Sequence, residues 1–121
     1  MPRFVVLEHN HPVLHWDFML EQGLALRTWR LARPPAPGLP IEAEALGAHR
    51  LAYLEYEGPV SGNRGRVTRW DRGTFRWLTE EEERVVVHLE GVRLSGTAEL
   101  VQAVEGWRFT LQAGAGDLAS G

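Results

Sequence analysis

The first twenty residues contain a set of side chains that could bind a metal ion. His9, His15 and Asp17 lie within one short stretch. Residues two apart in a strand share one face, so His15 and Asp17 point the same way, and a short connection would bring His9 beside them. Two imidazoles and one carboxylate are a usual ligand set for a divalent transition metal, and manganese, zinc, iron and nickel all fit. Surface or turn histidines would give the same spacing, so the pattern indicates a metal site without requiring one.

Further along the chain, a second pair of residues could act on a group bound at such a site. His49 is followed four residues later by Tyr53. A histidine that is not a ligand can act as a general acid or hold a phosphate oxygen, and a tyrosine hydroxyl can hydrogen-bond the same group. Taken alone, a turn histidine and a core tyrosine are the simpler interpretations. His88 lies in an apolar run, and we interpret it as structural.

The composition excludes several kinds of chemistry. The chain has no cysteine, which excludes disulfides, iron–sulfur clusters, thiolate zinc sites and cysteine nucleophiles. All 13 basic residues are arginine and the formal net charge is −3, which argues against non-specific coating of nucleic acid. The arginines gather at 27–33 and 64–76, so an acidic chain can still have a basic face suited to phosphate contacts.

No segment of the sequence reads as a membrane anchor or a leader. No apolar run approaches the roughly 20 residues that span a bilayer, and the start of the chain lacks the pattern of a signal peptide. We therefore expect a cytoplasmic protein.

Most of the chain has the alternation that is typical of β-strands. Strands are predicted at 3–9, 14–20, 24–31, 66–71, 74–78, 85–90, 92–102 and 106–112. The stretch 33–40 is a proline-rich loop, 41–48 is weakly periodic, 51–56 is one helical turn or a short strand, and 71–73 is a turn. Many short antiparallel strands at near-regular spacing predict a barrel or sandwich. We interpret four tryptophans beside strand arginines as core rather than as platforms for nucleobases: Trp29, Trp70, Trp77 and Trp107.

The run from Phe4 to Glu21, FVVLEHNHPVLHWDFMLE, resembles the opening motif of the 3′-phosphoesterase domain of bacterial DNA ligase D. In that family the pattern is close to F-V-V-x-x-H, five residues, then H-Y/W-D-F-R-L-E. The resemblance continues through 26–33 (LRTWRLAR), 49–58 (HRLAYLEYEG) and 70–73 (WDRG), and through the closing strands. It covers roughly 3–113. The first and third motifs are specific in combination, and each alone is weak.

This resemblance implies a mainly β domain at 1–113, a compact antiparallel β-barrel with short helical turns at its rim, followed by a flexible Gly/Ala-rich tail at 114–121. It implies a manganese-dependent enzyme that removes 3′-phosphates or 3′-ribonucleotides from nucleic-acid ends in break repair. The chain would be a stand-alone version without polymerase or ligase domains. Its partners would be DNA or RNA 3′ ends and repair proteins.

The resemblance also implies a role for individual residues. The metal ligands would be His9, His15 and Asp17. His49 would contact the scissile phosphate, as general acid or as a group that stabilises the transition state, and Tyr53 would support that phosphate site. The family has a basic residue near the site, usually lysine, at the position of Arg33.

The chain departs from the family pattern at several positions. The family has an arginine that grips the phosphate two residues after Asp17, and this chain has Met19. Asn63-Arg64 replaces a Gly-x-Tyr-Gly pattern, Gly47-Ala48 replaces an acidic residue, and His11 is additional. Loss of such a phosphate contact removes roughly 2–4 kcal/mol of transition-state stabilisation, for which Arg64 or Arg33 could compensate. Two alternatives stay open: Met19 motivates a module that binds nucleic-acid ends with weakened turnover, and the net charge of −3 motivates a hydrolase of another phosphoester.

Overall fold

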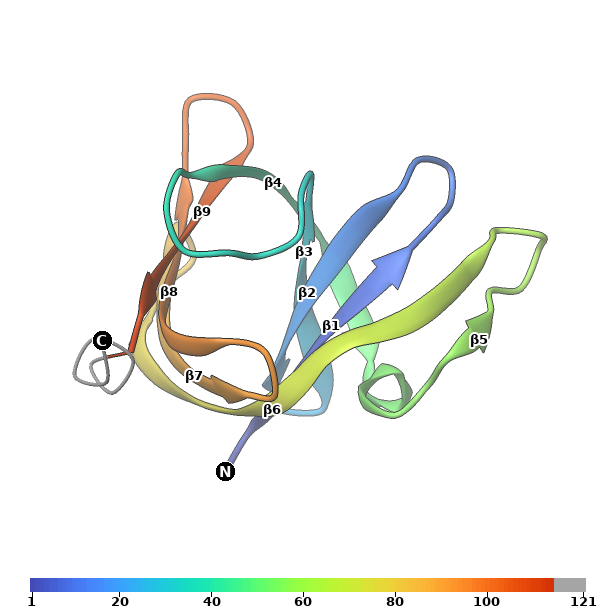
Figure 1. Ribbon diagram of the computed structural model, residues 1–121, viewed down its shortest axis with the longest axis horizontal. Coiled ribbons are helices and arrows are strands. Elements are labelled where there is room, and N and C mark those ends of the chain that lie inside the picture. Colours follow the sequence, from blue (N-terminus) through green and yellow to red (C-terminus); the bar gives the residue numbers. More distant parts are fainter. Residues whose placement is uncertain (115–121) are drawn as a thin grey trace.

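In the computed structural model, which describes residues 1–114, eight antiparallel strands close into a barrel (Figure 1). Around the barrel the order is β1-β2-β3-β4-β9-β8-β7-β6, and β6 pairs with β1 to close it. The strands are β1 (Arg3–His9), β2 (His15–Gln22), β3 (Ala25–Leu31), β4 (Ile41–Arg50), β6 (Arg66–Glu80), β7 (Arg84–Gly91), β8 (Ser95–Gln102) and β9 (Trp107–Ala113). A two-residue strand, β5 (Gly58–Pro59), pairs with the start of β6, and η1 (Leu51–Leu54) is one 3-10 turn. The predicted antiparallel β-barrel with a short helical turn is confirmed.

The weakly periodic stretch after the proline-rich loop is a strand, which the sequence did not predict. In β4, Ile41 and Ala43 are buried while Glu42 and Glu44 are exposed, so the alternation of a strand is present. It is hard to read in the sequence because alanine and glycine are weak strand formers. Pairing with β3 along most of its length and with β9 at its start stabilises β4.

Strand β6 runs without interruption through a segment where the sequence predicted a turn, so that prediction was wrong. Asp71 is buried, and its carboxylate accepts hydrogen bonds of 2.9, 3.0 and 2.8 Å from the backbone N–H groups of 92–94. Gly73 lets β7 approach closely, since a Cβ there would lie 2.0 Å from the carbonyl oxygen of Glu90. The turn between β7 and β8 lies at 92–94, so β8 begins at Ser95 and not at the predicted residue 92.

Two apolar clusters lie on opposite faces of the first strands. The interior cluster takes side chains from all eight barrel strands, among them Phe18, Trp29 and Phe109. Trp70, Trp77 and Trp107 pack against it, as predicted for the tryptophans. The outer cluster lies on the other face of β1, β2 and β3, under η1, and consists of Val5, Leu7, Met19, Leu26, Leu54 and Val67. The first two strands are therefore buried on both faces, which explains their continuous apolar character.

Within the described part of the chain, no helix is long and apolar enough to cross a membrane. The predicted tail at 114–121 falls outside the described residues except for Gly114. The backbone N–H of Gly114 donates to the carbonyl oxygen of Ser95, so this residue still belongs to the ladder of the barrel.

Candidate metal centre and its surroundings

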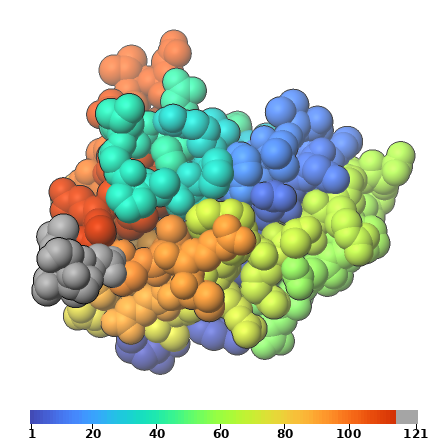
Figure 2. Space-filling view, viewed as in Figure 1, coloured from blue at the N-terminus to red at the C-terminus, as the bar shows by residue number. Residues whose placement is uncertain are grey.

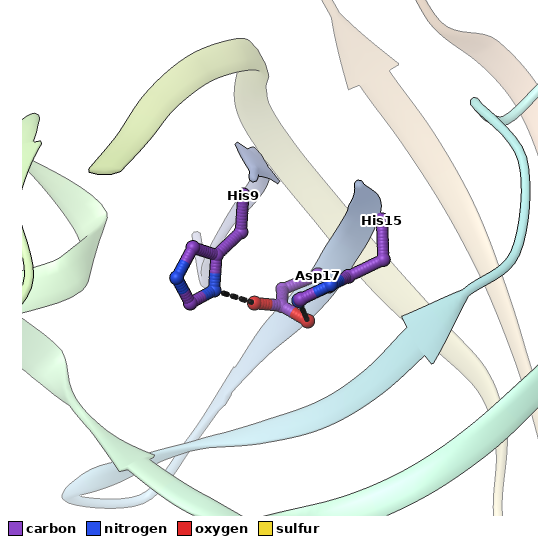
Figure 3. Close-up of side chains that lie close together, drawn as sticks. All are labelled: His9, His15 and Asp17. Atoms are coloured by element: carbon purple, nitrogen blue, oxygen red, sulfur yellow. Dashed lines mark ion pairs between the residues drawn. The ribbon is translucent and has the colours of Figure 1, made fainter. Parts of the chain in front are cut away.

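The β1–β2 hairpin brings the three predicted metal ligands together (Figure 3). His9 and His15 are directly opposite each other, and Asp17 lies two residues along β2 on the same face. His9 Nδ1 lies 3.8 Å from Asp17 Oδ2, and His15 Nε2 lies 3.3 Å from Asp17 Oδ1. One ligand atom from each residue lies within 4.8 Å of the other two. The three side chains therefore converge on one point of the outer face.

Backbone carbonyl groups fix which nitrogen of each histidine faces the carboxylate. His9 Nε2 donates to the carbonyl oxygen of Arg64, and His15 Nδ1 donates to that of Val13, both at 2.8 Å. A carbonyl oxygen can only accept, so in the neutral rings the opposite nitrogens keep their lone pairs. Those nitrogens are the ones that approach Asp17. Metal-binding histidines are held in the same way, by a hydrogen bond from the ring nitrogen that does not bind the metal.

Two buried atoms of this cluster make no hydrogen bond to residues 1–114. His15 and Asp17 are each 4% exposed. Among residues 1–114, neither His15 Nε2 nor Asp17 Oδ1 has a hydrogen-bond partner. A buried polar atom left unpaired costs roughly 1–3 kcal/mol. A proton on His15 Nε2, 3.3 Å from Asp17 Oδ1, would satisfy both atoms, and so would coordination of a divalent cation, so these residues fit a metal ion.

The surroundings of His15 shift its protonation equilibrium. Burial lowers the pKa of His15, but the close approach of Asp17 and the hydrogen bond to the Val13 carbonyl raise it more. The guanidinium of Arg30 acts in the same direction as burial. The net result is a pKa above the ordinary value of 6.5. A metal ion would have to displace this proton in order to bind.

A β-bulge in β4 places His49 on the same face as the ligands. Thr28 on β3 is opposite Leu46, whereas Leu26 is opposite His49, so β4 has one extra residue between these pairs. In a regular ladder Ala48 would occupy the position opposite Leu26, and His49 would point to the other face. His49 Nδ1 donates to the carbonyl oxygen of Gly47 at 2.8 Å within the bulge, and its Nε2 makes no hydrogen bond to residues 1–114.

His9, Asp17 and His49 line one hollow of about 370 Å³, and His15 lies behind it, beside Asp17. Tyr53, on η1, lines it beside His49, and the two rings meet edge to face with centroids 5.8 Å apart. His11, the histidine that is additional to the family pattern, also lines the hollow. The structure thus brings five of the six predicted site residues to one place: His9, His15, Asp17, His49 and Tyr53.

The β1–β2 turn is seated against the loop that precedes β6, and in the space-filling view the two segments lie side by side (Figure 2). Asn10 Oδ1 accepts a hydrogen bond of 2.8 Å from the backbone N–H of Arg66. Gly65 has a φ of +76°, and a Cβ there would lie 2.4 Å from Asn10 Oδ1 and 2.6 Å from His11 Cβ. This position therefore needs glycine, and the contact holds the Arg64 carbonyl against His9.

The sixth predicted site residue, Arg33, lies outside the hollow. Its Nη2 donates to the carbonyl oxygen of Pro40 at 2.9 Å across the proline-rich loop. The arginines that line the hollow are Arg30 and Arg64. Met19 lies on the floor of the hollow and is 2% exposed in the outer cluster.

Arg30 is a residue that the sequence reasoning missed as part of the site. It is directly opposite Asp17 in the β2–β3 pairing. The pairing depends on the exact position of the turn: pairing outward from residues 23–24, where the structure has it, places 17 opposite 30. The predicted strands at 14–20 and 24–31 did not fix that position, so the sequence did not identify Arg30.

Comparison with known proteins identifies the family of this chain. The sequence profile of a family described as "DNA Ligase D 3'-phosphoesterase domain" matches residues 7–102. The chain is 30% identical over 110 residues to the "Multifunctional non-homologous end joining protein LigD" of Pseudomonas aeruginosa, with 83% of this chain and 13% of that protein covered. It is 29% identical over 108 residues to the LigD protein of Mycobacterium bovis, with 82% and 14% covered.

These relatives are much longer proteins, and the chain spans about one seventh of their length. The matched region contains the end of β1 from Leu7 onward, all of β2, the β4 bulge and η1. The ligand cluster and the hollow therefore lie within the matched region. This chain belongs to the DNA ligase D 3′-phosphoesterase domain family.

Proposed function

We propose that this chain is a metal-dependent 3′-phosphoesterase that removes a 3′-phosphate or a 3′-ribonucleotide from nucleic-acid ends in DNA end joining. The observation that supports it most is the pair of buried atoms without partners, His15 Nε2 and Asp17 Oδ1, beside the free lone pair of His9. The family supports the choice of 3′ ends as substrate, and the names of the relatives support the choice of end joining.

The ligand set determines how a metal ion would be held. His9 Nδ1, His15 Nε2 and an oxygen of Asp17 would bind it, and we propose Mn²⁺, although the same donors accept other divalent transition metals. When bound, such an ion supplies Lewis-acid activation of a phosphoryl group. The carbonyl groups of Arg64 and Val13 would keep both imidazoles in the ligating tautomer.

His49, which lines the same hollow, would act as a general acid on the leaving group. Its Nδ1–H is held by the Gly47 carbonyl, so a second proton on Nε2 could be donated to the oxygen that leaves the phosphorus. The hydroxyl of Tyr53, next to this ring, would donate to a phosphoryl oxygen. Because the guanidinium of Arg33 is engaged with Pro40 outside the hollow, we give it no part in this reaction.

The proposal is tested with a 5′-labelled DNA primer that ends in a 3′-phosphate, annealed to a longer template. With Mn²⁺ the wild-type chain should release inorganic phosphate and leave a 3′-hydroxyl primer. Asp17→Asn should release none, whereas Glu105→Gln, which removes a carboxylate from an exposed turn, should behave as wild type. A wild-type chain that binds Mn²⁺ but releases neither phosphate nor a 3′-ribonucleotide would refute the proposed activity.

One observation favours a second candidate, a module that binds nucleic-acid ends without turning them over. Met19 occupies the position of the family's phosphate-gripping arginine and is packed into the outer cluster. Its thioether offers a phosphate no positive charge. This candidate predicts a gel shift that is selective for 3′-phosphate ends and no product with Mn²⁺.

A further inference from the structure

Arg30 lies where it can reach a group bound at the candidate metal centre. It is directly opposite Asp17 on the neighbouring antiparallel strand, and side chains of such a pair stand on one face with Cβ atoms about 4.5–5.5 Å apart. It lines the hollow that contains His9 and His49. It also lines a second hollow of about 390 Å³, whose other lining residues are the β1–β2 turn, His15, Ala32 and residues 42–44 of β4. Arg30 therefore lies between the two hollows and lines both of them.

The donors of Arg30 are poorly used by the protein itself. Within residues 1–114 its Nε is buried without a hydrogen-bond partner. Its Nη1 lies 3.8 Å from Glu44 Oε1, and that carboxylate is 66% exposed. An exposed ion pair at this distance contributes about 0–1 kcal/mol. A stronger anion could therefore displace Glu44 at little cost.

The other arginines near the site are already engaged. Arg64 donates from Nε to the carbonyl oxygen of Ser61 at 2.7 Å and from Nη2 to Ser61 Oγ at 3.2 Å. Arg33 donates to Pro40 outside the hollow. Arg30, in contrast, is directly opposite Asp17 and lines the hollow that contains His9 and Asp17. Of these three arginines, Arg30 has the donors and the position to meet an anion at the centre.

We propose that Arg30 binds the terminal phosphate in this site, reaching it from β3 because position 19 on β2 is a buried methionine. This inference rests on the proposed function. A guanidinium forms two parallel hydrogen bonds with phosphate oxygens, a geometry that an ammonium cannot supply. The adjoining hollow would receive part of the nucleotide chain that carries this phosphate.

The test measures binding to a DNA end that cannot be hydrolysed. The probe is a primer–template duplex with a 3′-methylenephosphonate, in which carbon replaces the bridging oxygen, and the reference is the same duplex with a 3′-hydroxyl. Fluorescence anisotropy is measured with Mn²⁺ for wild type, Arg30→Met and Arg30→Lys. Arg76→Met is the matched control, since it removes the same charge from an exposed position of β6 outside every hollow described above.

Wild type should prefer the phosphonate end, and Arg30→Met should weaken binding of that end about tenfold or more. Binding of the 3′-hydroxyl duplex should change less than twofold. Arg30→Lys should recover part of the loss, and Arg76→Met should behave as wild type. Equal weakening of both duplexes by Arg30→Met, or no weakening, would overturn the inference, as would a wild type without preference for the phosphonate.

A kinetic measurement separates this inference from the proposed function. If wild type prefers the phosphonate through Arg30 but releases no phosphate from a 3′-phosphate primer, the phosphate site stands and the proposed activity fails. If wild type releases phosphate and Arg30→Met has unchanged kcat and KM, the activity stands and the role of Arg30 fails. Mn²⁺ affinity, measured calorimetrically, should be within about twofold of wild type in Arg30→Met. A loss of Mn²⁺ binding would assign Arg30 to the metal site and overturn its proposed role.

Discussion

On the inner face of β2, Trp16, Phe18 and Leu20 pack into the interior cluster, whereas the outer face of the same strand carries His15, Asp17 and Met19. Both faces are buried. The inner face is apolar and is satisfied by packing with all eight strands. The outer face buries two titratable groups beside a small apolar cluster and leaves two of their polar atoms without partners.

This difference shows how one strand separates stability from chemistry. A charged group or a metal ion is costly to bury in a closed apolar interior, and the ligands lie outside it, on a face where a hollow gives access to His9 and Asp17. The rigid barrel behind β2 holds that face in place. Changes on the inner face should therefore act on stability, and changes on the outer face should act on binding and turnover.

The largest expected effect is the loss of metal binding from the outer face. His15→Ala removes one of three ligands, and we expect Mn²⁺ affinity to fall at least about 100-fold, with turnover lost in parallel. The barrel should remain folded, because the interior cluster is untouched. Isothermal titration with Mn²⁺ measures the loss. His88→Ala, which removes a histidine that faces Glu90 away from the site, is the matched control, and equal affinities in the two variants would contradict the ligand assignment.

Removing His49 should affect turnover without affecting the metal. We expect His49→Ala to lower kcat about 10²–10⁴-fold, the usual range for a general acid or base, while Mn²⁺ affinity stays within about twofold of wild type. Steady-state kinetics on the 3′-phosphate primer and a Mn²⁺ titration check the two parts. A large loss of Mn²⁺ affinity in this variant would mean that His49 is a ligand.

A pair of substitutions on neighbouring residues of β2 compares the two faces directly. Phe18→Ala should lower the free energy of unfolding by about 3–5 kcal/mol, because a fully buried ring is replaced by a cavity. Met19→Leu, which keeps the volume on the outer face, should lower it by less than about 1.5 kcal/mol. Urea denaturation gives both values. Similar losses in the two variants would show that the outer cluster is as tightly packed as the interior.

The smallest expected effect is a pair of opposite pH trends caused by His15. Its folded pKa lies above 6.5, so its protonation stabilises the metal-free fold. That contribution is fully present below the unfolded pKa and is lost as the pH rises through the folded pKa. Mn²⁺ needs the neutral ring. As the pH is lowered, the apparent Mn²⁺ affinity should therefore begin to fall while the pH is still above 6.5, by about tenfold per pH unit for each displaced proton.

Thermal unfolding of the metal-free chain and Mn²⁺ titration between pH 5 and pH 8 measure both trends. His15→Gln should remove the contribution of this residue to the stability trend, which makes it the control. Metal-free stability that rises with pH across this window in wild type but not in His15→Gln would contradict the sign of the pKa shift.

The sequence predicted the parts of the fold that depend on local alternation. The β1–β2 hairpin, the β2–β3 hairpin and the later strands follow from apolar and polar residues that alternate along the chain. β4 was not predicted because its alternation is carried by alanine and glycine against glutamate, and because one of its two partners, β9, is distant in sequence. The continuity of β6 escaped because Asp71 and Gly73 form a turn signal in isolation, and only their contacts with β7 and the 92–94 turn explain them.

The site divided along the same line. The ligands follow from the period of a strand and one short connection, so His15 and Asp17 could be placed on one face from spacing alone. The face of His49 could not, since a bulge reverses the parity between Leu46 and His49. The position of Arg33 could not either, because the conformation of the proline-rich loop decides where its guanidinium lies.

The buried carboxylate of Asp71 has a consequence for where this fold can work. It sits on β6 opposite Val6 of β1 and accepts three backbone hydrogen bonds from the turn that follows β7, so this side chain fastens that turn to β6 at the seam where the barrel closes. Small domains often make such a fastening with a disulfide, which needs oxidising surroundings to form and persist. In this chain, which has no cysteine, the link is made of hydrogen bonds. Its stability therefore does not depend on whether the surroundings are oxidising or reducing.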